Sequence, residues 1–251
     1  MNALITGASS GIGRALARLH VAAGGSVVLV ARRGDRLAAL CNELGPRAHA
    51  IAMDLSAPGA ATALFAEVSA RGLAVELLVN NAGVGAHGRF DQTSPAALHA
   101  LLAVNVTVLT ELSRAFLPPM IARGSGRVLN LASMAAFVPG PTCAAYHASK
   151  AYVLSLSEAL AYELRGTGVS VTAACPGAVA TEFADAAGML RTRAFTSAAD
   201  TDKIAQAIYR ATLRGDRIYV PGVFNRFAAL MTQILPRRFV TQAAARALEN
   251  V

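Results

Sequence analysis

The sequence has little of what would place it in a specialised class of protein. Its 251 residues include no tryptophan and only three cysteines, and 15% of them are charged. The cysteines are far apart and form no CxxC pair, so the sequence indicates neither a disulfide framework nor a zinc site. Hydrophobic residues make up 54% of the chain, which excludes intrinsic disorder. A chain of this length and composition suits one globular α/β domain better than two independent ones.

Signals for export, membrane insertion and metal binding are also missing. No apolar run reaches the roughly 20 residues that a membrane-spanning helix needs. The chain passes from Met1 directly into an apolar strand pattern, so we expect no signal peptide. The five histidines include no HExxH motif, and no metal is expected. Together with the separated cysteines, these absences predict a reducing, cytoplasmic setting.

The positive charge of the chain is large but scattered. The formal net charge is +8, and only Lys150 and Lys203 among the 23 basic residues are lysines. No basic run is longer than a pair, so the sequence does not form the stripe that binds nucleic acid, and no nucleic-acid partner is expected. The charge instead favours solubility and anionic small molecules.

Apolar runs of strand length alternate with segments of helical periodicity. Strands are expected at residues 3–6, 27–31, 48–53, 77–80, 128–131, 169–174 and 218–220. Helices are expected at 12–23, 36–44, 60–70, 95–120 and 146–165. The continuous apolarity of the strands suits a sheet that is covered on both faces. The alternation predicts an α/β fold, a doubly wound parallel sheet of about seven strands in a single domain.

A glycine-rich turn, TGASSGIG, follows the first expected strand and opens a helix. Glycines let backbone amides approach a pyrophosphate closely, and the helix N-terminus faces its negative charge. Because the turn lies between a strand and a helix at the start of a βαβ unit, we assign it to a dinucleotide. The residues assigned to this contact are Gly7, Ser9, Ser10, Gly11, Ile12 and Gly13.

The end of the second expected strand indicates which dinucleotide binds. In NAD-binding folds an acidic residue at this point holds the ribose hydroxyls, whereas a basic residue accommodates the 2′-phosphate of NADP. Ala31 occupies the acidic position, and Arg32 and Arg33 follow it. Arginine also binds phosphate with two parallel hydrogen bonds. The sequence therefore favours NADP(H) over NAD(H), although Arg33 alone would also suit a solvated strand end.

Two further groups follow successive expected strands. Asp54 and Leu55 come after the third strand, and Asn81, Ala82 and Gly83 come after the fourth. Doubly wound sheets bind ligands at the carboxyl edge of their strands, so we assign these residues to the cofactor site as well. Taken alone, the aspartate would suit a helix cap, and the asparagine a plain turn.

The candidate catalytic residues are Ser133, Tyr146, Lys150 and Asn105. Tyr146 and Lys150 are four residues apart, so both side chains project from one face of a helix. A nearby ammonium group favours the phenolate and should lower the tyrosine pKa from its usual value of about 10. Ser133 ends the fifth strand and can hold a substrate oxygen, while Asn105 is a polar residue in a core-facing stretch of helix.

These motifs resemble the short-chain dehydrogenase/reductase family in its single-domain form. The resemblance extends from Met1 to about Pro221. It consists of TGASSGIG, the Asp54-Leu55 pair, NNAG, Asn105, Ser133, YHASK at Tyr146–Lys150 and PGAVAT at Pro176–Thr181. Each motif is modest, but their joint order and the thirteen positions from Ser133 to Tyr146 are very specific. The resemblance implies a Rossmann-like fold.

The resemblance also implies a role for each site residue. Tyr146 would be the general acid in reduction, and Lys150 would lower its pKa and hold the nicotinamide ribose. Ser133 would orient the carbonyl, and Asn105 would bend its helix and bind a water that links Lys150 to solvent. Thr181 and the backbone near Val179 would hold the nicotinamide carboxamide, and Pro176 and Gly177 would also contact the cofactor. The long helices at 95–120 and 146–165 would pair in a homodimer or homotetramer.

The last thirty residues, 222–251, are expected to be a helical extension of the 1–221 domain. Apolar residues fall there at helical spacing, with arginines available to another face. This element would pack on the domain or on a sister subunit, cover an apolar substrate, or rest on a membrane surface. Side chains that flank the catalytic positions are also apolar, and we expect them to line the pocket: Met134, Phe137, Val138, Pro139, Phe183 and Met189.

We therefore interpret the chain as an NADP(H)-dependent carbonyl reductase or alcohol dehydrogenase. The expected substrate is a small-molecule carbonyl or alcohol, such as an apolar ketone, an aldehyde or a 3-oxoacyl group. Three alternatives stay open at this point. They are an NAD-dependent alcohol dehydrogenase of the same family, a dinucleotide-binding protein without turnover, and a membrane-surface protein with contact through residues 223–239.

Overall fold

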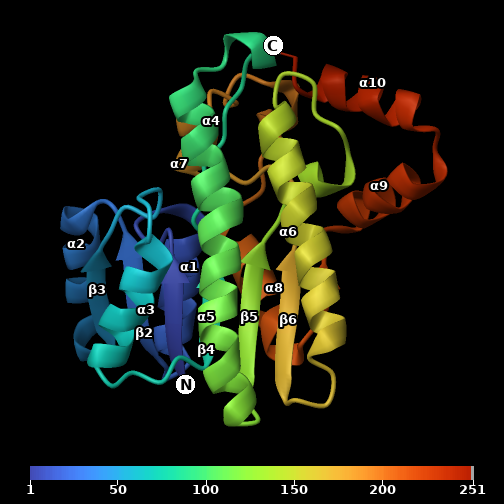
Figure 1. Cartoon of the computed structure of the whole chain (residues 1–251). Helices are drawn as coiled ribbons and strands as arrows, with labels where there is room; N and C mark the ends of the chain where they lie inside the picture. Colours follow the sequence, from blue (N-terminus) through green and yellow to red (C-terminus); the bar gives the residue numbers. More distant parts are fainter. Residues whose placement is uncertain (250–251) are drawn as a thin grey trace.

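The computed structural model describes residues 1–249 and contains one parallel sheet of seven strands. The strand order is β3-β2-β1-β4-β5-β6-β7, and every neighbouring pair is parallel. The strands are β1 (Asn2–Thr6), β2 (Ser26–Ala31), β3 (Ala48–Ala52), β4 (Leu77–Asn80), β5 (Gly126–Leu131), β6 (Val169–Ala174) and β7 (Ile218–Tyr219). The expected doubly wound sheet is confirmed (Figure 1).

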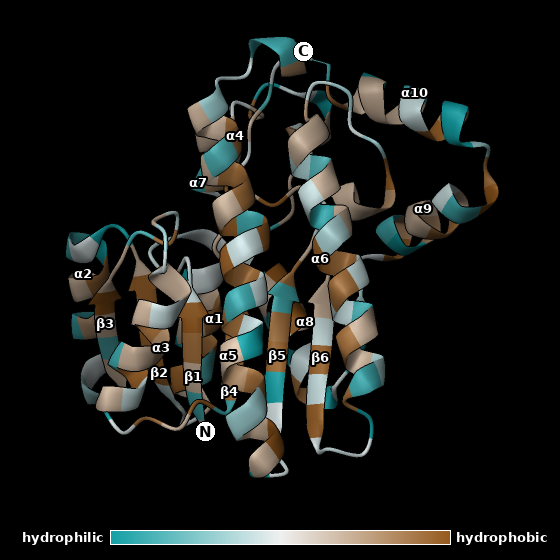
Figure 2. Ribbon diagram, in the orientation of Figure 1, coloured by the Kyte–Doolittle hydropathy of each residue, from teal (hydrophilic) through white to brown (hydrophobic). Residues whose placement is uncertain are grey.

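Helices cover both faces of this sheet. They are α1 (Gly11–Ala22), α2 (Gly34–Leu44), α3 (Ala60–Ala70), α4 (Pro95–Leu102), α5 (Leu109–Ala122), α6 (Ala144–Glu163), α7 (Glu182–Ala186), α8 (Thr201–Arg214), α9 (Val223–Ile234) and α10 (Arg237–Ala247). In Figure 2 strand β1 is brown, and so apolar, along most of its length, whereas β5 includes hydrophilic teal segments. The apolar pattern of β1 follows from burial on both faces, because side chains alternate between the two sides of a strand.

The two faces of β1 show how the core is divided. Ala3 and Ile5 pack with α1, α2 and α8 on one side of the sheet. Leu4 points to the other side, where it packs with α3 and α5. All three residues are at most 1% exposed. The glycine-rich turn after β1 is therefore carried by a strand that is fixed from both sides.

Two helical segments differ from the sequence prediction. The stretch 95–120 was expected as one regular helix, but a π-helical turn at Ala103–Val108 separates α4 from α5. Helix α8 was not predicted, although it is strongly amphipathic and is bounded by two ordinary helix signals. Asp200 accepts a hydrogen bond from the Lys203 backbone N–H at its start, and Gly215 ends it in the left-handed conformation.

The stretch Pro95–Ala122 is also more apolar than the sequence prediction allowed. It contains an 18-residue window with a mean hydropathy of 1.5, long and apolar enough to cross a membrane. However, its α5 part packs against α3, β4 and β5, with Leu112 and Met120 in the core. Core helices of soluble proteins have the same length and composition, so this stretch alone does not indicate a membrane span.

Thr6 ties the first strand to the loop after β4. Its hydroxyl donates to the Val79 carbonyl at 3.2 Å and accepts the backbone N–H groups of Asn81 and Ala82, each at 3.0 Å. The side-chain amide of Asn81 in turn donates a hydrogen bond to the Thr6 carbonyl at 2.8 Å. These bonds hold two loops of the carboxyl edge in a fixed relative position.

We expect the replacement Thr6→Val to lower the free energy of unfolding by about 2 kcal/mol, because two backbone N–H groups lose their acceptor without a change of side-chain shape. Thr62→Val is the matched control, since Thr62 is exposed on α3. Urea unfolding of both variants measures the effect. Equal midpoints for the two variants would show that the Thr6 hydroxyl does not hold the loops together.

Candidate active site

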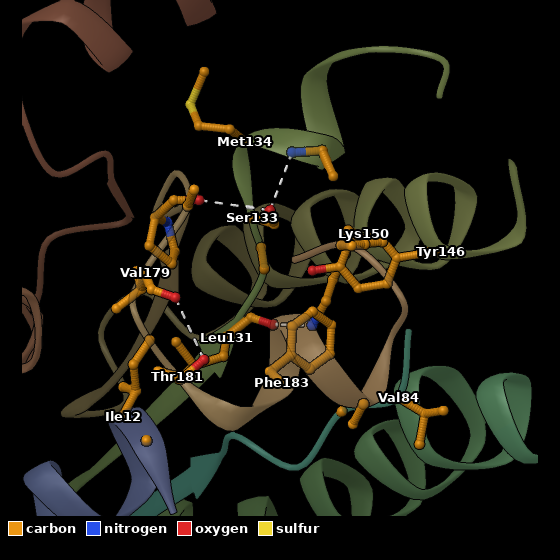
Figure 3. A pocket seen from close by; sticks show the side chains of 18 of the residues that line it. Ile12, Val84, Leu131, Ser133, Met134, Tyr146, Lys150, Val179, Thr181 and Phe183 are labelled. Carbon is orange, nitrogen blue, oxygen red and sulfur yellow. Dashed lines mark hydrogen bonds between the residues drawn. The ribbon is translucent and has the colours of Figure 1, made fainter. Parts of the chain in front are cut away.

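A cavity of about 1050 Å³ lies at the carboxyl edge of the sheet. Its walls come from the turn after β1, the ends of β2, β3, β4, β5 and β6, and helices α6, α7, α9 and α10. This is the edge at which parallel α/β sheets bind their ligands. Figure 3 shows Ser133, Tyr146 and Lys150 inside this cavity, with the strand end that carries Leu131 behind them.

The structure places nearly all residues that the sequence assigned to the site on this one cavity. Of the candidate catalytic residues, Ser133, Tyr146 and Lys150 line it, and Asn105 does not. All the residues assigned to the cofactor line it except Gly13. They are Gly7, Ser9, Ser10, Gly11, Ile12, Arg32, Arg33, Asp54, Leu55, Asn81, Ala82, Gly83, Tyr146, Lys150, Pro176, Gly177, Val179 and Thr181.

The glycine-rich turn has a conformation that side chains would not allow. Gly7 and Gly11 have φ angles of 66° and 53°, in the left-handed region. A Cβ atom on Gly13 would lie 2.4 Å from the Asn81 Nδ2 atom and 2.5 Å from the Gly7 carbonyl oxygen. Gly13 therefore acts by close packing behind the turn, which explains why it does not face the cavity.

The N-terminus of α1 is open toward the cavity. Ser10 is the N-cap residue of this helix, but its side chain makes no capping hydrogen bond. The backbone N–H groups of a first helical turn have no partner within the helix. Ser10, Gly11 and Ile12 line the cavity, so these donors and the helix dipole are positioned for an anion.

Two asparagines after β4 have different structural roles. Asn81 donates to the carbonyls of Thr6 and Gly7, at 2.8 and 3.2 Å, and so supports the glycine-rich turn. Asn80 is buried and donates to Ser113 and Asn130, at 3.2 and 2.9 Å. This polar link ties β4 to α5 and β5 beneath the cavity.

An ion-pair cluster lies at the end of the cavity where β2 finishes. Arg33 donates to the hydroxyls of Ser9 and Ser10 at 3.0 and 3.1 Å and to the Glu182 carboxylate at 2.8 Å. Arg36 donates to both Glu182 oxygens, at 2.6 and 2.7 Å. Hydrogen bonds from these arginines, from Arg33 above all, hold the pKa of Glu182 below its usual range. The cluster therefore joins α7 to the β2–α2 connection.

Sequence reasoning missed both Glu182 and Arg36 as part of the site. Arg36 lies three residues after Arg33, so helical spacing alone could have placed them on one face. Glu182 comes directly after the PGAVAT motif, but nothing in the sequence shows that α7 folds back toward β2.

Arg32 and Asp54 form the opposite side of this end of the cavity. Asp54 accepts hydrogen bonds from the Ser56 backbone N–H and hydroxyl, at 2.9 and 2.8 Å. These bonds, with a smaller effect of the Arg32 charge, lower the pKa of Asp54. Arg32 makes no hydrogen bond or ion pair within residues 1–249 and is exposed. Its guanidinium is therefore available to a ligand.

Lys150 is deeply buried, with 5% of its surface exposed. Its ammonium donates to the Leu131 carbonyl at 2.6 Å, at the end of β5 (Figure 3). Burial lowers the pKa of Lys150 to about 8, because removal from water disfavours the charged form. The ammonium lies 5.8 Å from the centre of the Tyr146 ring, so the two groups share one helix face as the spacing predicted.

The expected lowering of the Tyr146 pKa is not what the structure gives. Burial raises the pKa of Tyr146 to about 12, while hydrogen bonding to Ser133 acts in the opposite direction. The cost of placing a phenolate in this apolar surrounding exceeds any stabilisation from Lys150, whose ammonium is directed at Leu131. Tyr146 is therefore protonated at neutral pH.

Ser133 is positioned by the chain on both sides of it. Its hydroxyl accepts the Ala135 backbone N–H at 3.1 Å and lies 3.5 Å from the Pro176 carbonyl. Ser133 thereby caps a short 3-10 turn at Met134–Phe137 and lies against the loop after β6. In Figure 3 its oxygen and that of Tyr146 point toward the same part of the cavity.

Asn105 is a positioning residue beneath the cavity. It lies in the π-helical turn and is 1% exposed. Its side-chain oxygen accepts the Val84 N–H, and its amide donates to the Val84 carbonyl, both at 2.8 Å. The same amide reaches Ser149, whose hydroxyl donates to the Tyr146 carbonyl at 2.7 Å. Asn105 thus joins the loop after β4 to the helix that carries Tyr146 and Lys150.

The other end of the cavity is apolar, as expected, but its walls differ in part from the prediction. Met134, Val138, Phe183 and Met189 line it, and the Phe183 ring lies 5.6 Å from that of Tyr146. Phe137 packs instead against the core around Val153 and Leu154, and Pro139 is not among the lining residues. The C-terminal hairpin of α9 and α10 adds a further wall, which was one of the three roles expected for residues 222–251. Its lining residues are Ala228, Met231, Leu235, Phe239, Val240, Ala243, Ala244, Ala247 and Leu248.

Comparison with known proteins identifies the class. The family of short chain dehydrogenases matches residues 1–190, and the chain belongs to this family of oxidoreductases. It is 39% identical over 212 residues to a sulfoacetaldehyde reductase of Chromohalobacter salexigens, a match that covers 83% of this chain and 80% of that protein. It spans 60% of the length of another, longer relative, to which it is 40% identical.

Solved structures agree with this membership. A short-chain dehydrogenase from Sphingobium yanoikuyae in complex with NADPH has a TM-score of 0.84 and 32% identity, with 93% of each chain covered. A short chain dehydrogenase/reductase from Burkholderia phymatum in complex with NAD has a TM-score of 0.82 and 28% identity, and the match covers 100% of this chain and 97% of that one. Relatives of this fold therefore bind either nicotinamide dinucleotide.

The buried ammonium of Lys150 should make stability depend on pH. Because burial lowers its pKa from 10.5 to about 8, the unfolded chain holds this proton more tightly than the folded protein does. Between those values the unfolded state binds more protons, so the lysine's contribution to the free energy of unfolding rises with pH. We expect wild type to gain about 3 kcal/mol relative to Lys150→Met between pH 7.5 and 10.5.

Denaturant unfolding of both proteins across this pH range measures that difference. The comparison with Lys150→Met cancels the titration of all other groups. A difference that stays constant, or that shrinks as the pH rises, would show that the lysine is not held as a desolvated cation.

Proposed function

We propose that the protein is an NADP(H)-dependent oxidoreductase that transfers hydride between nicotinamide and an apolar carbonyl or alcohol. The observation that carries this proposal is the position of Tyr146 and Ser133. Their hydroxyls lie where one cavity changes from a glycine-lined, arginine-bordered half to an apolar half. A dinucleotide fits the first half and a carbonyl compound the second.

The residues of the first half fit a dinucleotide. The left-handed glycines and the open first turn of α1 suit a pyrophosphate. Ala31 carries no carboxylate for the ribose, and Arg32 is free to bind a 2′-phosphate. The Sphingobium relative, which was solved with NADPH, supports the same choice.

The bound cofactor supplies or accepts the hydride, and the protein supplies position and the proton. In reduction, Tyr146 donates its proton to the carbonyl oxygen as negative charge develops there. Ser133 donates a hydrogen bond to the same oxygen and fixes its direction. Lys150 places a positive charge beneath the tyrosine, which stabilises the phenolate that the donation leaves.

The substrate class follows from the second half of the cavity. Its walls are mostly methionine, phenylalanine, valine, leucine and alanine side chains, with His147 and Thr232 among the polar ones. Tyr146 and Ser133 supply the hydroxyls that would meet a carbonyl. A substrate with one carbonyl or hydroxyl and a bulky apolar body suits this arrangement. Pairing of copies through α4, α5 and α6 stays a prediction for the oligomer.

NAD(H) is the second candidate cofactor, because the Burkholderia relative was solved with NAD. We expect Arg32→Ala to weaken NADPH binding at least tenfold and to leave NADH binding unchanged, because only NADPH carries the 2′-phosphate. Arg47→Ala is the control, since this exposed arginine precedes β3 at the opposite edge of the sheet. Fluorescence titration of both cofactors measures the constants. An unaltered preference in Arg32→Ala would contradict the assigned phosphate site.

Removal of the Tyr146 hydroxyl should abolish most of the activity without loss of the cofactor. We expect Tyr146→Phe to lower kcat by about a thousandfold, within the range for loss of a general acid. Tyr152→Phe is the matched control, because Tyr152 lies on the same helix but its hydroxyl pairs with Thr110 on the surface. NADPH absorbance with a panel of apolar ketones, aldehydes and 3-oxoacyl thioesters measures both variants. No oxidation by wild type on any carbonyl would overturn the proposed function.

A further inference from the structure

The C-terminal hairpin of α9 and α10 has two apolar faces, and the cavity accounts for only one of them. The inner face contributes Met231, Leu235 and Phe239 to the cavity wall. The hairpin is anchored where α9 begins, since the Asn225 amide donates to the Pro221 carbonyl at 2.9 Å and lies against Gly177. In Figure 1 the two helices extend outward beyond α6, and their connection is the outermost point of the view.

The outer face of the hairpin carries large apolar side chains that are open to solvent. Val223, Phe224 and Phe227 are 75%, 80% and 59% exposed, and Ile234 is 66% exposed. Five of the sixteen large exposed apolar residues in the described part of the chain lie on α9 outside the cavity lining: Val223, Phe224, Phe227, Leu230 and Ile234. Contiguous exposed patches of this kind mark an interaction surface, whereas scattered single residues do not. The outer face of the hairpin is therefore a candidate interaction surface.

The charges around this apolar patch are all positive, and they favour an acidic partner. From Arg217 to Leu248 the chain has five arginines and no aspartate or glutamate. Arg226 lies within α9, and Arg237 and Arg238 open α10. A helix pair with an apolar face and only positive charge beside it is typical of elements that lie in the interface of an anionic bilayer. The local charge opposes a basic partner and favours an acidic surface.

A second copy of the chain suits the patch less well. A two-fold interface brings the same patch of both subunits together. Both hairpins would then bring Arg226 and the Arg237-Arg238 pair into one interface, with no carboxylate on either hairpin to compensate them. We infer that the outer face of the α9–α10 hairpin docks on a membrane surface that contains anionic lipids.

This inference extends the proposed function, and what it implies for the substrate rests on that function. The exposed side chains that would enter the lipid lie on α9, and those that line the cavity come from the same hairpin of α9 and α10. The apolar half of the cavity would then lie directly behind the docked surface. A lipophilic carbonyl compound dissolved in the bilayer would reach Tyr146 by a route that passes the hairpin rather than through water.

Vesicle co-sedimentation of the full chain tests the inference. The vesicles are phosphatidylcholine alone, or phosphatidylcholine with about a quarter phosphatidylglycerol, which gives the negative surface that arginines recognise. We expect wild type to bind the anionic vesicles at least tenfold more tightly than the neutral ones, and to be released by salt. Equal binding to both vesicles, or no binding to either, would overturn the inference.

Two variants separate the apolar and charged contributions. Phe224→Asp combined with Phe227→Asp should weaken anionic binding at least tenfold, and so should the charge reversal Arg226→Glu, Arg237→Glu, Arg238→Glu. Phe90→Asp is the control, because Phe90 is 62% exposed outside the hairpin. None of these residues lines the cavity, so circular dichroism and NADPH titration should match wild type. Wild-type affinity in the double aspartate variant would overturn the inference.

Sedimentation velocity without lipid tests the alternative that a second copy of the chain covers the patch. If the double aspartate change dissociates an oligomer and wild type does not bind anionic vesicles, the patch is a subunit interface and the inference is wrong. An unchanged oligomer with lost vesicle binding supports it. Because these measurements need no turnover, they stand even if no carbonyl substrate is found, and activity on carbonyls stands even if the vesicles do not bind.

Discussion

The site depends on one buried hydrogen bond, that of the Lys150 ammonium with the Leu131 carbonyl. This bond joins helix α6 to the end of β5, and thereby holds Tyr146 and the strand end that carries Ser133 in one geometry. The bond also carries a cost, because a cation in this apolar surrounding is poorly solvated. The buried ammonium provides a fixed positive charge beneath the phenol of Tyr146. Charged groups whose pKa is shifted by burial are common at functional sites.

Most of the fold follows from local sequence patterns. Most residues of the six strands from β1 to β6 are apolar, and burial on both faces of a parallel sheet favours such strands. The glycine-rich turn is also readable, because its left-handed glycines leave no freedom of residue type. Helix α8 could have been found from its caps at Asp200 and Gly215, whereas the π turn around Asn105 depends on the contacts with Val84 and Ser149.

The sequence predicts those site residues that belong to local motifs. It does not predict those properties of the site that depend on contacts between distant parts of the chain. Tyr146 and Lys150 meet because one helical turn separates them, and this needs no tertiary information. Their pKa values do depend on tertiary structure. For Tyr146, the effect of burial is larger than that of the ammonium group, so the pKa is raised rather than lowered as expected. The apolar wall from α9 and α10 depends likewise on where the hairpin folds back, which the helical spacing of its residues does not specify.

Glu182 makes the position of one cavity wall depend on charge. Its carboxylate bridges from α7 to Arg33 and Arg36, so the short helix after PGAVAT is tied to the β2–α2 connection by two ion pairs. All three side chains are at least two-fifths exposed, and water and ions weaken such pairs readily. The tie therefore loosens as ionic strength increases. Because α7 also carries Phe183 into the cavity wall, the shape of that wall depends in part on the salt concentration of the surrounding solution.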